Sequence, residues 1–163
     1  MTFMPDSVVN ANLYPIQATF IAVRELHFVA HRPPSPSDRI DQSSVRITKK
    51  VGPFNAETKL IQITLIAELG FDAESTAPAP PFSVKVAITA EFCIGDAFPR
   101  DKIAQWAATN SAFVIFPYLR ERLYYITVQA GYPPICLPLL QIPSFKVEPV
   151  LSEAVVPSIG SAP

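Results

Sequence analysis

The 163-residue sequence is poor in the residues that build chemical sites. It has two cysteines, two histidines and five glycines, and the glycines are too scattered to form a phosphate-binding loop. Two cysteines are too few for a disulfide framework. Cys93, Cys136, His27 and His31 supply every soft metal ligand, and they share no metal-binding spacing. The sequence therefore predicts no metal site and no cofactor.

Catalytic groups are equally scarce. Asp96, Asp101 and Glu121 could serve a general acid–base pair, but nothing in the sequence places them together, which favours solvated or capping roles. The cysteines have apolar neighbours, on a predicted strand for Cys93 and in a connection for Cys136, as buried small side chains do. We therefore expect a protein that is not an enzyme.

The sequence also lacks an excess of charge of one sign. Its 13 Lys and Arg residues nearly balance 14 Asp and Glu residues, so it indicates no basic face for nucleic acid. No apolar run reaches the ~18 residues of a membrane-spanning helix, and the N-terminus lacks the pattern of a secretory signal. We expect a cytoplasmic protein. The chain is nevertheless 49% hydrophobic, and so much apolar surface favours an oligomer or an apolar partner.

Proline is abundant, with 18 residues, and its clusters mark the connections. Between them, polar and apolar side chains alternate over 14–30, 59–71 and 82–94, and a shorter stretch, 45–48, could be a further strand. Residues 72–81 contain no helical pattern. The two strands that they connect, 59–71 and 82–94, are therefore expected to pair antiparallel.

Residues 100–130 lose the alternation and acquire a helical pattern. Pro99 opens the first turn. Pro117 removes a hydrogen bond from the second half, so we expect a kink, or two helices with a break near Asn110–Ser111. Gly131 fits a C-terminal cap. The order of elements predicts an α+β fold, in which a four-stranded antiparallel sheet is followed by a long, kinked helix.

The second half of this helix is apolar all round, and in a chain this short another copy is needed to cover its second side. The sequence thus predicts a homo-oligomer. After the helix, the apolar segment Tyr132–Leu140 is stiffened by prolines. Beside a half-covered sheet, such a loop makes a groove for extended or unfolded chain. The alternative is that the loop packs on its own sheet or on a partner subunit.

Two motifs point to a family. Phe116–Glu121 has the sequence Phe-Pro-Tyr-Leu-Arg-Glu, and Gly131–Pro138 has the sequence Gly-Tyr-Pro-Pro-Ile-Cys-Leu-Pro. With the four preceding strands, these motifs resemble the SecB family of protein-export chaperones, and Ala107–Phe113 is more similar to its toxin–antitoxin-associated branch. The resemblance implies a dimer of dimers, that is, a homotetramer. It also implies an ATP-independent holdase that binds non-native polypeptide in hydrophobic grooves.

The resemblance assigns roles to residues by position. It places the client groove at Val45, Ile47, Tyr132, Ile135 and Leu137. It places the oligomer interface at Phe116, Tyr118, Leu119 and Glu121. It places the face that docks the export motor SecA at Glu25 and Lys85.

Departures from the family bear on the partner. Val29 and Lys85 stand where the SecA-docking face has acids, and a reversed charge at a complementary interface lowers affinity. Pro143, Pro149 and Pro157 interrupt the segment that forms a second helix in the family. The expected client is either a dedicated protein, such as an antitoxin, or secretory preproteins.

These patterns divide the chain into a flexible N-terminus (1–12), a SecB-like domain (13–145) and a loose, proline-containing tail (146–163). Two other functions fit the composition. One is an α+β oligomer that binds a small molecule or acyl chain in the same groove, with Glu121 or Asp96 as a base, and it requires a buried polar cluster. The other is a structural assembly subunit whose self-contacts consume the apolar surface.

Overall fold

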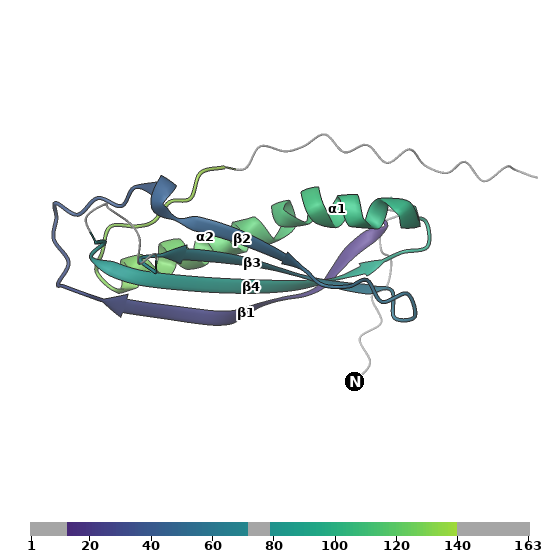
Figure 1. Ribbon diagram of the computed structural model, residues 1–163, viewed down its shortest axis with the longest axis horizontal. Helices are drawn as coiled ribbons and strands as arrows, with labels where there is room; N and C mark the ends of the chain where they lie inside the picture. The colour runs from purple at the N-terminus through teal and green to yellow at the C-terminus, as the bar shows by residue number, and fades with distance from the viewer. Residues whose placement is uncertain (1–12, 72–78, 140–163) are drawn as a thin grey trace, which may run out of the picture.

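The computed structural model describes residues 13–71 and 79–139. Four strands form one antiparallel sheet in the order β1-β4-β3-β2. They are β1 (Ile16–Ala30), β2 (Arg46–Val51), β3 (Leu60–Leu69) and β4 (Phe82–Ile94). Two α-helices follow, α1 (Ile103–Thr109) and α2 (Ser111–Gln129). The helices run along one face of the sheet (Figure 1), and α2 packs across β3 and β4. The α+β fold predicted from the sequence is confirmed.

The strand boundaries agree closely with the alternation. β4 spans the predicted 82–94, and β3 lies within the predicted 59–71. β2 is longer than the predicted 45–48. β3 and β4 pair antiparallel as expected, with Ile63 opposite Ala90.

Three of the predictions fall on other parts of the chain. The flexible N-terminus 1–12, the tail 146–163 and the proline-interrupted segment from residue 141 lie outside the described residues.

The core lies between the sheet and the helices. β3 turns its odd-numbered apolar side chains toward the helices, and β4 turns its even-numbered ones, because successive side chains of a strand point to opposite faces. The fully buried members include Ile63, Val84, Ile88 and Phe92 from the sheet, and Trp106 of α1 packs edge-on against Phe92 with ring centroids 5.0 Å apart. From α2 the core receives Ile115, Leu119 and Leu123.

β1 departs from the single alternating face that the sequence predicts. Its pairing with β4 shifts by one residue between Ala18 and Phe20 and again between Val23 and Glu25. Each β-bulge inserts one residue and shifts the alternation by one. Between the bulges, the odd-numbered Ile21 and Val23 share the face of the buried β4 residues, and the second bulge restores the predicted alternation. Leu26 therefore lies opposite the buried Val86, and it is 52% exposed because β1 is an edge strand while α2 packs across β3 and β4.

The helical region breaks where the sequence predicts. α1 ends at Thr109, α2 begins at Ser111, and Asn110 joins them, its backbone N–H donating to Trp106 O at 2.8 Å. Pro117 lies inside α2. Gly131 has φ +82°, the left-handed conformation of a C-terminal cap, and its N–H donates to Val128 O at 3.0 Å.

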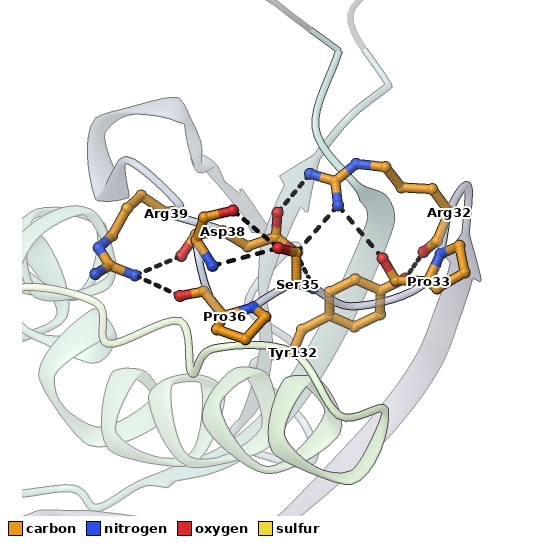
Figure 2. A network of polar contacts seen from close by, with 8 residues as sticks. Arg32, Pro33, Ser35, Pro36, Asp38, Arg39 and Tyr132 are labelled. Atoms are coloured by element: carbon orange, nitrogen blue, oxygen red, sulfur yellow. Dashed lines mark hydrogen bonds and ion pairs between the residues drawn. The ribbon is translucent and has the colours of Figure 1, made fainter.

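A polar network connects the β1–β2 loop to the segment that follows α2 (Figure 2). The Asp38 carboxylate is buried and forms an ion pair with Arg32, and the backbone N–H of Ser35 donates to it at 2.8 Å. The Tyr132 hydroxyl donates to the backbone carbonyl of Arg32. The hydrogen bond from Arg32 holds the pKa of Asp38 below its ordinary value, with help from Ser35. The network holds residues 32–38 against Tyr132, which follows α2.

Candidate functional site

An apolar cavity of about 430 Å³ lies along α2. One wall is the helix and the other is the segment that follows Gly131. The lining residues are Phe116, Pro117, Arg120, Glu121, Tyr124, Cys136 and Leu139. Leu139 is 81% exposed at its rim. The only charged groups are Arg120 and Glu121, and neither is buried. The cavity therefore offers apolar contact without a buried polar cluster.

A second cavity, of about 540 Å³, lies where the start of β1 meets the junction between the helices. It is lined by Tyr14, Ile16, Gln17, Ala18, Phe92, Trp106, Asn110, Phe113 and Val114. Partial burial raises the pKa of Tyr14. Here again aromatic and aliphatic groups dominate, while Gln17 donates to the Tyr14 carbonyl at 2.6 Å.

Beside these cavities, α2 carries an exposed stripe, whose members Val114 and Glu121 also line them. Residues three and four apart share one side of a helix, which groups Val114, Tyr118, Glu121, Tyr125 and Val128. Each of the four apolar or aromatic members is at least 40% exposed. The opposite side of α2 is buried against the sheet. The helix thus has apolar residues on both sides, as the sequence predicts, and the chain's own sheet covers one of them.

The predicted groove residues do not form one free surface in the protomer. Val45, Tyr132, Ile135 and Leu137 are buried in the core, whereas Ile47 on β2 is 40% exposed. Tyr132 packs against the stacked rings of Phe28 and Phe82, and the Ile135 N–H donates to the Thr127 hydroxyl at 3.1 Å. The loop therefore packs on its own sheet, which was the alternative left open from the sequence. Contact of these residues with a client stays a prediction.

The predicted interface residues divide into two pairs. Phe116 and Leu119 are buried within the protomer, where they stabilise its core. Tyr118 and Glu121 lie in the exposed stripe of α2, and Tyr118 is 50% exposed. Only the second pair is available to another copy, and its role there stays a prediction.

The face of the sheet away from the helices is polar and electrically balanced. Lys85 of β4 lies 3.1 Å from the Glu25 carboxylate of β1 and 3.6 Å from Glu68 of β3. Arg46 of β2 lies 2.9 Å from Glu68. These contacts raise the pKa of Lys85, chiefly through Glu25, and lower that of Glu68, chiefly through Arg46. The predicted SecA-docking pair, Glu25 and Lys85, is thus an internal ion pair in a row of alternating charge.

The candidate catalytic acids lie on different elements. Asp96, after β4, is held by Lys59 at 2.6 Å and by Arg100 at 3.0 Å, and the hydrogen bond from Lys59 is the main reason why its pKa is lowered. Glu121 on α2 lies 3.4 Å from Arg122.

No group of three or more metal-ligating side chains occurs among residues 13–71 and 79–139. Both cysteines are free and half-buried.

Polar contacts made by His31, Ser83 and Lys49 were not predicted. The His31 Nε2 lies 2.7 Å from Ser83 Oγ, which donates to Gly70 O at 2.9 Å, so the histidine nitrogen must be the donor. The Lys49 ammonium donates to the last carbonyls of α1, those of Ala107 and Ala108. These contacts join distant segments, for which a single sequence carries no local signal.

Within the described part of the chain, no helix is both long enough and apolar enough to span a bilayer.

Comparisons with known proteins place the fold. No family model matches the chain. The uncharacterized protein MJ0357 of Methanocaldococcus jannaschii is 27% identical over 121 residues, which cover 74% of this chain and 75% of that protein. Among solved structures, the SecB-like chaperone Rv1957 of Mycobacterium tuberculosis, in complex with a ChAD peptide from the HigA1 antitoxin, matches with a TM-score of 0.61. Its identity is 22%, with coverage of 79% of this chain and 93% of that one.

A protein of unknown function from Streptococcus agalactiae also matches, but with a TM-score of 0.43 and 12% identity. That similarity is too low to show a shared fold. The match to Rv1957 shows that the chain has a SecB-like fold, as the motifs around Phe116–Glu121 predict.

Proposed function

We propose that the protein is an ATP-independent holdase chaperone that binds non-native polypeptide through apolar surfaces beside α2. One observation carries the proposal: α2 is fully packed on its sheet side and yet leaves an apolar stripe and an apolar cavity open to solvent. Monomeric proteins rarely expose contiguous apolar surface without a partner. The fold supports the same reading, because Rv1957 was solved with a peptide bound.

The cavity along α2 suits a polypeptide better than a small-molecule substrate. Its volume of about 430 Å³ lies in the range of ligand pockets. Small-molecule sites, however, add a few placed polar groups that fix orientation. Here Arg120 and Glu121 are at the surface, and Asp96 lies on another element, held by two cations. Apolar contact without fixed polar groups suits extended polypeptide, which it binds through side-chain burial.

The proposal includes a homo-oligomer, a dimer of dimers, in which the stripe of α2 meets another copy. The stripe has one charge, Glu121, among apolar and aromatic side chains. Burying them would gain about 25 cal/mol per Å² of apolar area. The client is a dedicated protein, such as an antitoxin, rather than preproteins passed to SecA. Glu25 favours this choice because Lys85 neutralises it, so the outer sheet face offers no acidic patch.

A holding assay with size measurement in the same sample tests the proposal. A denatured protein that aggregates on dilution is added to buffer with and without this chain, without nucleotide, and light scattering is followed. The proposal expects scattering to fall to near baseline at about one oligomer per denatured chain. Unchanged scattering with a stable oligomer would contradict holding. Added SecA then separates the two clients, since a preprotein carrier forms a complex with SecA and a dedicated chaperone does not.

A further inference from the structure

β2 is an edge strand with an unused row of backbone groups. It pairs with β3 on one side, and no other strand of the described chain pairs with its other side. The Gly52 N–H donates to Gln62 O at 2.8 Å, in register with the ladder. Hydrogen-bonded pairs alternate in an antiparallel ladder. Thr48 and Lys50 therefore bond to β3, while the N–H and C=O groups of Ile47, Lys49 and Val51 point outward.

This edge is held rigidly from both faces of the sheet. On the helix side, Lys49 Nζ donates to Ala107 O at 3.2 Å and to Ala108 O, and burial lowers the pKa of this lysine. On the other side, Arg46 bonds to Glu68 at 2.9 Å. The strand is thus fixed before anything binds, so little ordering entropy of the protein would oppose the addition of another strand.

The side chains beside the outward groups define what fits. Ile47 and Val51 lie on the helix side and are 40% and 46% exposed. The six residues of β2 include three cations and no acid. Like charges directly opposite each other destabilise a strand pair, so two copies of this edge would repel. An extended segment that alternates apolar and acidic residues would place its apolar side chains beside Ile47 and Val51, and its acidic side chains beside Lys50 on the opposite face.

The other edge of the sheet is a poorer template. β1 is long, but its two bulges interrupt its alternation. Bulges at sheet edges hinder pairing with a further strand. β2 has a continuous register over its full length.

We propose that the client binds in part by strand addition: an extended segment with alternating apolar and acidic residues pairs with β2 as a fifth strand of the sheet. This inference rests on the proposed function and deepens it, because it assigns part of the binding to main-chain hydrogen bonds. Main-chain bonds give affinity without reading side chains, and the flanking pockets set the preference.

Amide exchange measured residue by residue tests the proposal. The probe is reduced, carboxymethylated α-lactalbumin, an acidic protein that stays unfolded. In the free protein, the N–H groups of Thr48 and Lys50 exchange slowly and those of Ile47, Lys49 and Val51 exchange fast. At saturation with the probe, the proposal expects the three outward amides to slow at least tenfold. If the probe binds and these amides exchange as before, strand addition is refuted while holding stands.

A matched pair of variants gives a second measurement. Ile47→Pro removes one outward N–H and no bond to β3, and edge positions of this kind tolerate proline. Ile47→Ala removes the side chain alone. Relative to Ile47→Ala, the proline variant is expected to weaken probe binding about fivefold, the worth of one hydrogen bond. Equal affinities of two folded variants would refute strand addition. If the wild-type chain holds no probe, the proposed function fails first and takes this inference with it.

Discussion

Thr127 stabilises the far wall of the α2 cavity, and its replacement gives a sharp prediction. Its buried hydroxyl donates to the carbonyls of Leu123 and Tyr124, at 3.0 and 2.9 Å, and accepts from the Ile135 N–H at 3.1 Å. Thr127→Val keeps the shape and deletes the hydroxyl. The Ile135 N–H is then left buried without a partner, which costs about 1–3 kcal/mol. We expect the free energy of unfolding to fall by that amount.

Ser111→Ala is the matched comparison. Ser111 is also fully buried, but its hydroxyl only donates, to Ala107 O at 2.7 Å. Its loss orphans no backbone N–H, so we expect a cost below about 1 kcal/mol. Urea unfolding measures both variants, and amide exchange of Ile135 reports the local effect. Equal costs for the two variants, or an unchanged Ile135 exchange rate in Thr127→Val, would refute the reasoning.

Three further predictions concern assembly, acid stability and the core. Tyr118→Asp is expected to shrink the oligomer in light scattering and leave the circular dichroism unchanged; an oligomer of wild-type size would contradict the role of the stripe. The lowered pKa of Asp38 means that its contribution to stability is present above about pH 4 and is lost as the pH falls through its folded value. The gap in urea midpoint between wild type and Asp38→Asn should therefore close in acid, and a constant gap would show that Asp38 is not the titrating group. Leu119→Ala, at a fully buried position, should cost about 2–5 kcal/mol in urea unfolding, and a cost below about 1 would contradict its place in the core.

Local patterns of the sequence predict the framework of this protein well. The alternation over β4 matches its bounds because the strand is central and both neighbours hold its register. The helix break at Asn110 and the cap at Gly131 follow from backbone chemistry at single residues. β1 was harder, since the insertion of a residue at a bulge leaves no mark in the alternation of side chains.

The candidate site was predictable only in outline. That α2 is apolar on more than one side is visible in its sequence. The segment after Gly131 has no periodicity, so the sequence could not show that Tyr132, Ile135 and Leu137 turn into the core. Which side chains line the cavity depends on how that segment lies along α2. The outward row on β2 depends on which pairs of the ladder are hydrogen-bonded, a property of register.

The central claim is that exposed apolar surface beside α2 holds polypeptide that is not folded. The most direct measurement is fluorescence anisotropy of labelled α-lactalbumin titrated with this protein in the absence of nucleotide. The same polypeptide is tested in its native form and in its reduced, carboxymethylated form. The account predicts saturable binding of the unfolded form and none of the native form. No binding of the unfolded form, or equal binding of both, would contradict it.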